Sequence, residues 1–78
     1  MFYAHKGSAY DNAFTIDQYG QPTREFVGFE TKKARRDYQN EVFNNSNDNV
    51  IFCSRRFVEK YLGRDFYVSE SGFCFRND

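Results

Sequence analysis

Apolar and polar residues alternate in the first few positions of the chain. Residues 2–5 place Phe2 and Ala4 on one side of an extended backbone and Tyr3 and His5 on the other. Alternation with a period of two is typical of a β-strand, so we predict a short strand here. Small and polar residues follow over positions 7–12, which are expected to form a loop.

A second alternating pattern surrounds a strong turn signal. Residues 13–18 put Phe14 and Ile16 on one face, and residues 24–29 alternate again. Between them lies Tyr19-Gly20-Gln21-Pro22, in which glycine adopts positive φ at low cost and proline is excluded from a central strand. We therefore predict an antiparallel hairpin of residues 13–18 and 24–29.

The spacing of apolar residues becomes helical after Thr31. Thr31 is a suitable N-cap, and Ala34, Tyr38 and Val42 recur at four-residue intervals, which places them on one stripe of a helix. The polar run at 44–49 is expected to end this helix and to form a loop.

A strand and a second helix are predicted next. Residues 50–53 are a short apolar run that fits a buried strand, and Ser54 is a suitable N-cap. Gly63 fits the C-terminal end of the helix. The apolar face of this helix would carry Phe57, Val58, Tyr61 and Leu62.

The last part of the chain alternates twice more, at residues 65–68 and 73–76, with a polar turn at 69–72 between them. These residues predict a second hairpin. The whole pattern predicts one compact α+β domain over residues 1–78. It would be a small antiparallel sheet of about four to six short strands with two helices packed on one face.

The composition indicates an aromatic core. The chain contains ten Phe and six Tyr, whereas Leu62 is its single leucine. Aromatic side chains bury large areas, and disordered segments are poor in them, so we expect a folded domain. We also expect the Phe residues to form the core and the Tyr residues to form its rim.

Charge and cysteine content narrow the function classes. Eleven basic residues balance eleven acidic ones, no apolar run is long enough to cross a membrane, and the N-terminus does not read as a secretory signal. A cytoplasmic protein without membrane contact is therefore expected. Cys53 and Cys74 lie 21 residues apart and lack the paired spacing of a structural zinc site. They could form one bridge, but without a secretory signal a reducing cytosol is expected, and therefore two free thiols.

No set of residues predicts catalysis. His5 is the single histidine and has no acid or nucleophile at a recognisable spacing, so we expect it at the surface or rim. The glycines are scattered at turn positions and form no phosphate-binding loop. We expect a protein that is not an enzyme and uses no metal or cofactor.

Basic residues gather on the two predicted helices, and those on the second include Arg64. If the helices are neighbours, the cations form one positive face for an acidic protein patch or for phosphates. Tyrosine and arginine are common at binding hot spots. The candidate partner-binding residues are Lys32, Lys33, Arg35, Arg36, Arg55, Arg56, Lys60, Tyr3, Tyr10 and Tyr19.

Residues 27–38 read VGFETKKARRDY. This stretch resembles the "strand, Gly-Phe, acidic-Thr/Ser, Lys, Arg-Asp-aromatic" segment of small phage and prophage accessory proteins, in which a second short strand and helix follow, as at residues 50–62. The resemblance implies an accessory protein that binds a host factor, including CRISPR effectors and other defence complexes. It carries over no functional residue.

Three functional hypotheses follow. The first is a small phage-encoded interaction protein that binds and inhibits a host protein or a protein–nucleic-acid defence complex, as anti-CRISPR proteins do. It predicts that replacing Arg35 and Arg36 by Glu abolishes binding and leaves thermal stability nearly unchanged. The second is a nucleic-acid-binding module that uses the basic two-helix face. The third is a homodimer that buries exposed aromatic residues against a second copy.

Overall fold

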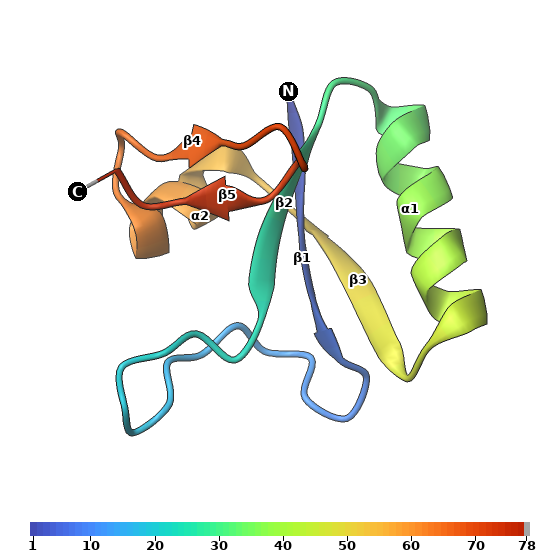
Figure 1. Cartoon of the computed structure of the whole chain (residues 1–78), viewed down its shortest axis with the longest axis horizontal. Coiled ribbons are helices and arrows are strands. Elements are labelled where there is room, and N and C mark those ends of the chain that lie inside the picture. Colours follow the sequence, from blue (N-terminus) through green and yellow to red (C-terminus); the bar gives the residue numbers. More distant parts are fainter. Residues whose placement is uncertain (78) are drawn as a thin grey trace.

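The computed structural model describes residues 1–77 of the 78-residue chain. A three-stranded sheet stands at the centre, with α1 on one side and α2 with a small hairpin on the other (Figure 1). The predicted α+β class with a small antiparallel sheet is confirmed. The elements in chain order are β1 (Phe2–Ser8), β2 (Glu25–Phe29), α1 (Lys32–Asn45), β3 (Asp48–Cys53), α2 (Arg55–Leu62), β4 (Tyr67–Val68) and β5 (Cys74–Phe75).

The first strand lies in the middle of the sheet and pairs antiparallel with both neighbours, in the order β2-β1-β3. The predicted hairpin of residues 13–18 and 24–29 is therefore wrong, because β2 pairs with β1 instead. Residues 13–18 instead make an isolated bridge, between Ile16 and Pro22. The Asp17 carboxylate accepts hydrogen bonds from the N–H groups of Tyr19 and Gln21, and this local turn competes with a strand ladder.

Two predicted loops are shorter than expected. Gly7 and Ser8 belong to β1, and β3 begins within the polar run 44–49, so both loop predictions are wrong at these positions. The reason is their mutual pairing, in which Gly7 lies opposite Asn49 and Ser8 opposite Asp48. Ladder hydrogen bonds between these polar residues override their individual preference for turns.

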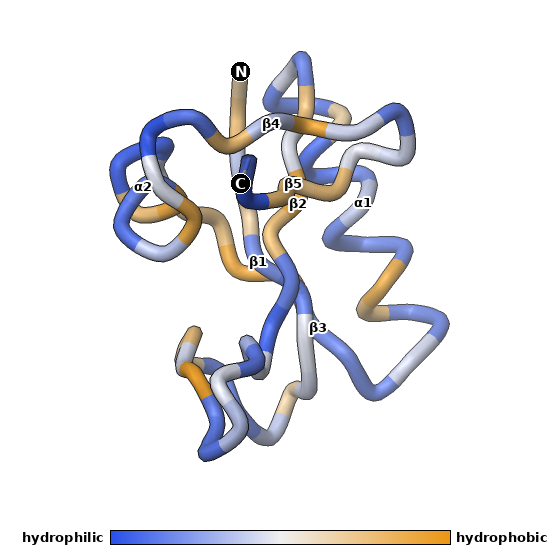
Figure 2. The backbone as a smooth tube through the Cα atoms, turned by 60° about the vertical axis from the view of Figure 1, so that its left-hand side comes forward, coloured by the Kyte–Doolittle hydropathy of each residue, from blue (hydrophilic) through white to orange (hydrophobic). Residues whose placement is uncertain are grey.

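The two helices cover opposite faces of the sheet. Tyr3 packs in a cluster with Val58 of α2, whereas its neighbour Ala4 packs with Val42 of α1. Consecutive side chains of a strand point to opposite faces, so the predicted packing of both helices on one face is wrong. Figure 2 shows β1 running between them, with α1 and α2 on either side. Both faces of β1 carry apolar side chains that need cover.

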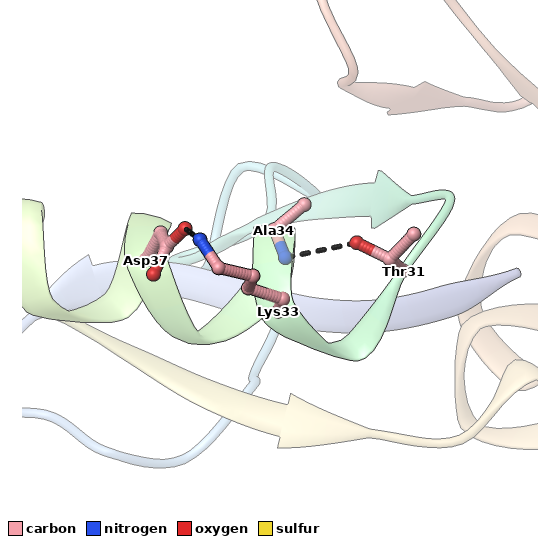
Figure 3. A network of polar contacts seen from close by, with 4 residues as sticks. All are labelled: Thr31, Lys33, Ala34 and Asp37. Carbon is pink, nitrogen blue, oxygen red and sulfur yellow. Dashed lines mark hydrogen bonds and ion pairs between the residues drawn. The ribbon is translucent and has the colours of Figure 1, made fainter.

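The predicted caps of both helices are confirmed. The Thr31 hydroxyl accepts a hydrogen bond of 3.0 Å from the N–H of Ala34 (Figure 3), and the Ser54 hydroxyl accepts one of 3.2 Å from the N–H of Phe57. Gly63 ends α2 with a φ of +85°, a left-handed conformation that favours glycine.

The predicted C-terminal hairpin is confirmed, with shorter strands than expected. Ser69 N–H donates to the carbonyl of Phe73, and Gly72 turns the chain with a φ of +94°. The hairpin also covers the outer edge of β2, because Gly28 N–H donates to the carbonyl of Gly72 over 2.8 Å.

The aromatic core is present, but it does not separate Phe from Tyr. Tyr3 is 3 % exposed and lies within the main cluster, whereas Phe43 on α1 is 75 % exposed. The expectation of a Phe core with a Tyr rim is wrong at these two positions. The strand register decides the burial of Tyr3, and the helical stripe that includes Val42 leaves Phe43 facing outward.

Candidate functional site

The predicted partner-binding residues do not form one surface. Those on α1 lie on one side of the sheet and those on α2 lie on the other, so the condition for a joint two-helix basic face is not met. Among the tyrosines, Tyr10 and Tyr19 are strongly exposed, while Tyr3 is buried and cannot present its ring to a partner.

Arg35 is held inside the protein's own structure. Its guanidinium lies 4.0 Å from the ring centroid of Phe52, and Nη1 donates a hydrogen bond of 3.1 Å to the carbonyl of Tyr3. The ring centroid of Phe2 lies 5.5 Å from the same guanidinium. These contacts join α1 to β1 and β3, so Arg35 has a structural role and is a poor candidate for binding a partner.

Arg55 reaches the same tyrosine from the opposite face. Its Nη1 donates a hydrogen bond of 3.0 Å to the Tyr3 hydroxyl, and the guanidinium lies 4.7 Å from the ring centroid of Phe66. Its Nε is 3.8 Å from the Glu59 carboxylate. Two of the predicted cations therefore bind the buried Tyr3: Arg35 binds its main-chain carbonyl, and Arg55 binds its hydroxyl.

The remaining cations of α1 are only partly available. Lys33 forms an ion pair of 2.9 Å with Asp37 on the exposed surface (Figure 3). Lys32 lies 5.8 Å from the ring centroid of Phe2. Arg36 is exposed, and within residues 1–77 it forms no ion pair or side-chain hydrogen bond.

Three exposed cations lie together at α2 and just beyond its end. Arg56 and Lys60 are four residues apart on the helix and so lie on the same side of it, and Arg64 follows the last helical residue, Leu62. We call these three residues the α2 basic face. They line a shallow hollow of about 590 Å³ together with Ser54, Phe57 and Glu59. Glu59 is the one acid in this lining, and Arg55 already contacts it.

A further cation lies beside the α2 basic face. Arg64, which the sequence groups with the second helix, follows the helix end and lines the hollow with Arg56 and Lys60. Arg76 comes from the end of the chain, donates a hydrogen bond of 2.7 Å to the Tyr61 carbonyl and lines an adjoining hollow with Lys60 and Arg64. No local pattern predicts the position of Arg76.

His5 is buried, at 4 % exposure, and its predicted place at the surface or rim is wrong. Its ring stacks on Phe57 at 5.7 Å and meets the edges of Phe14 and Phe26. Burial, and then the charge of Arg24, hold the pKa of His5 below its ordinary value of 6.5. The imidazole belongs to the core and not to an open site.

Arg24 is the most unusual buried group. It is 1 % exposed and donates to the backbone carbonyls of Ser8, Asp11 and Asn49 over 2.8–3.1 Å. It also bonds the ring and the carbonyl of His5. Arg24 thus joins the loop between β1 and β2 to β1 and β3, and its role is structural.

The two thiols have low reactivity. Cys53 and Cys74 are free cysteines in β3 and β5. Burial raises the pKa of Cys53 to about 12 and that of Cys74 to about 11. Both thiols therefore stay protonated at neutral pH, which makes a nucleophilic role for either a poor fit to the structure.

An apolar groove is formed by residues of β2, α2 and β5. The groove has a volume of about 420 Å³ and runs between the β1–β2 loop, the end of α2 and β5. Its lining includes Phe14, Phe26, Leu62 and Phe73. Within residues 1–77, no three His, Cys, Asp or Glu side chains are grouped in a way that could hold a metal ion.

The described helices are all too short or too polar to cross a bilayer.

Comparison of the chain with protein-family models, with curated proteins and with solved structures gives no match.

Proposed function

We propose that this chain is a non-enzymatic interaction protein whose α2 basic face binds an acidic patch on a partner protein. The observation that carries the proposal is that Arg56, Lys60 and Arg64 are exposed and line one hollow. Their only acidic neighbour in the hollow, Glu59, contacts Arg55. Asp65 lies in the adjoining hollow, where Arg76 adds a further cation, so the cations outnumber the acids and favour carboxylate or phosphate groups on a partner.

The balanced charge of the chain favours a protein partner over a nucleic acid. Eleven basic and eleven acidic residues leave no net charge, whereas nucleic-acid-binding domains are usually basic as a whole. A nucleic-acid-binding module remains the second candidate because the α2 basic face could contact successive phosphates. It would show a salt dependence of log K near −2.7 on duplex DNA, from about −0.9 for each of three phosphates.

The resemblance of residues 27–62 to phage accessory proteins supports a more specific form of the proposal. The partner would be a host protein or a protein–nucleic-acid defence complex, and binding would inhibit it. The exposed Arg56 and Lys60 would then be the central contacts among the candidate residues.

A pull-down from bacterial lysate, with and without nuclease, tests the proposal. The tagged chain is compared with an Arg56→Glu/Lys60→Glu/Arg64→Glu variant. A partner that survives nuclease and is lost with this variant is the expected result, because the variant places like charges against the acidic patch. Material that disappears with nuclease supports the nucleic-acid candidate instead.

A matched variant on α1 separates this surface from a general effect of charge. Lys32→Glu/Lys33→Glu/Arg36→Glu makes the same change in net charge on the opposite side of the sheet and avoids the buried contacts of Arg35. Binding should survive this change. If the α1 variant loses the partner and the α2 variant retains it, the proposed surface is wrong.

A further inference from the structure

The apolar groove between β2, the end of α2 and β5 continues into the α2 basic face. The groove shares Leu62 and Arg76 with the adjoining hollow at the end of α2. That hollow in turn shares Lys60 and Arg64 with the α2 basic face. An apolar surface and a cationic surface therefore meet at Leu62 and Arg76, and a single ligand could contact both.

The lining of the groove fits a bulky aromatic side chain. Phe14 and Phe26 are buried and lie at its base, whereas Phe75 is 48 % exposed and forms part of its wall. Its volume of about 420 Å³ lies within the range of about 300–1,000 Å³ that is typical of ligand sites. Because the lining consists largely of rings, it favours another ring, which can pack edge to face against them.

Arg76 supplies the positive charge at the border of the groove. Its Nη2 donates a hydrogen bond of 2.7 Å to the Tyr61 carbonyl, which holds the guanidinium at the end of α2. A guanidinium has several N–H donors, so Arg76 can bind a carboxylate while it keeps this bond. Arg24 also lines the groove, but it is 1 % exposed and its donors serve buried carbonyls and His5.

We propose that this groove anchors the partner: an acidic segment of a partner protein inserts an aromatic side chain into the groove and places its neighbouring carboxylates against the cations beside it. The inference rests on the proposed function, because these carboxylates belong to the acidic patch that the α2 basic face binds. The inserted ring packs among Phe14, Phe26 and Phe75, and the carboxylates reach Arg76 and Arg64. A buried aromatic anchor beside charged contacts is typical of binding hot spots.

Charge complementarity favours such a segment over an uncharged apolar ligand. The hollow next to the groove presents the cations Lys60, Arg64 and Arg76. Its acids are Asp65 and Glu59, and Glu59 already forms an ion pair within the protein. A wholly apolar ligand would fill the groove but would gain nothing from these cations, whereas an acidic segment is attracted by them.

The charges also fix the direction in which the segment lies. Glu25 of β2 lines the groove itself and disfavours an anion there. The carboxylates of the partner therefore belong on the α2 side, beyond Leu62, and the aromatic side chain belongs in the groove. This arrangement predicts that the aromatic residue and the acidic residues contribute separately to binding.

Short fluorescent peptides test the proposal, with binding to the purified chain measured by anisotropy. The first peptide is a run of glutamates followed by a pair of phenylalanines, and in the second peptide alanines replace the phenylalanines. The phenylalanine peptide should bind at least about tenfold more tightly, because it buries an aromatic side chain. A third peptide, with lysines in place of the glutamates of the first, should bind at least about tenfold more weakly than the first, because its charges are repelled.

Two variants of the C-terminal hairpin locate the contact. Phe75→Ser should lower the affinity for the phenylalanine peptide to that for the alanine peptide. Tyr67→Ser is the matched control, because Tyr67 is 50 % exposed and its ring centroid lies 5.9 Å from that of Phe75. Tyr67 is not among the described residues that line the groove. Both variants remove the same contact between rings, so only the loss of the groove wall distinguishes them.

The Arg56→Glu/Lys60→Glu/Arg64→Glu variant separates failure of the groove from failure of the α2 basic face. It should lose both glutamate peptides. If the chain binds both of them equally and this variant loses both, the α2 basic face stands and the groove proposal is overturned. Unchanged binding of the phenylalanine peptide by Phe75→Ser also overturns the groove proposal. If neither glutamate peptide binds, or the charge-reversed variant binds both unchanged, the proposed function fails and the groove proposal fails with it.

Discussion

The Nε–H of Arg24 donates a hydrogen bond of 2.7 Å to Nδ1 of His5, between two side chains that are 1 % and 4 % exposed. We infer that the imidazole is neutral, with its proton on Nε2, because Nδ1 serves as the acceptor. A protonated His5 would place two cations in contact inside the core, where charges are poorly screened. The fold therefore depends on the charge state of this one ring.

The first prediction is a loss of stability on mild acidification. Burial and Arg24 hold the pKa of His5 below 6.5 in the folded protein. The unfolded chain takes up this proton as the pH falls through about 6.5, and the folded protein does so only at lower pH. The free energy of unfolding should therefore have its full value above about pH 6.5 and should decrease as the pH falls below that. Urea unfolding between about pH 7 and pH 5 measures this change.

A non-titrating variant is the control for this prediction. His5→Asn keeps an oxygen acceptor for Arg24 and cannot take up a proton in this range. Asp11 and Asp48, which lie near Arg24, are present in both proteins, so the comparison isolates the contribution of His5. The pH dependence between about pH 7 and pH 5 should flatten in the variant, and an unchanged slope would assign it to another group.

The second prediction concerns the space that Gly7 leaves for Arg24. A Cβ at position 7 would lie 2.6 Å from Cγ of Arg24, and Gly7 does not have a positive φ. Gly7→Ala should cost about 3 kcal/mol, because it displaces the guanidinium from several buried carbonyls. Gly20→Ala is the comparison, since no atom lies near its Cβ and only its φ of +79° opposes the change, at about 1 kcal/mol. Urea unfolding measures which of the two variants is destabilised more. Gly20→Ala would be the more destabilised if Arg24 could move away from a Cβ at position 7 without losing its hydrogen bonds.

Local signals predicted the elements that depend on a few neighbouring residues. Thr31, Ser54 and Gly63 mark helix ends through their own side chain or backbone, and the structure confirms all three. The pairing of β2 with β1 could not be read in this way. It depends on Arg24, which anchors the intervening loop to carbonyls distant in sequence, and no periodicity reveals such a contact.

The same distinction applies to the candidate site. The shared side of Arg56 and Lys60 is visible in the sequence, because residues four apart in a helix lie on the same side of it. The structural roles of Arg35 and Arg55 are not visible there, because both depend on the place of Tyr3 in a sheet between two helices. A count of basic residues does not distinguish a cation that faces solvent from one that stacks on a ring.

The third prediction separates two adjacent arginines of α1. Arg35→Glu should lower stability by about 2 kcal/mol, because it removes the stack on Phe52 and the hydrogen bond to Tyr3. Arg36→Glu should change stability by less than about 0.5 kcal/mol, since Arg36 is exposed. Thermal unfolding followed by circular dichroism measures both. The structure thus argues against the expectation that Arg35 can be replaced with thermal stability nearly unchanged. Equally small effects of the two variants would support that expectation instead.

The fourth prediction compares the two contacts in Figure 3. Thr31→Ala should cost about 1 kcal/mol, because it leaves the N–H of Ala34 without its cap. Lys33→Ala should cost no more than about 0.5 kcal/mol, since its ion pair with Asp37 is exposed to solvent and salt. Urea unfolding at low and high salt distinguishes them. The effect of Thr31→Ala should persist at high salt, and a cap that contributes less than the ion pair would contradict the assignment.

The fifth prediction is that both thiols of the folded protein resist alkylation. The thiolate is the reactive form, and the pKa values of about 12 for Cys53 and about 11 for Cys74 leave roughly one thiol in ten thousand or fewer ionised at neutral pH. Unfolding returns both to an ordinary pKa near 8.5. Iodoacetamide should therefore modify each thiol at least about a hundredfold more slowly in buffer than in urea, and mass spectrometry of peptides distinguishes the two sites. Cys53 lies in β3, where it pairs with Tyr3, so rapid modification of Cys53 in buffer would mean that this end of the sheet opens far more readily than its packing implies.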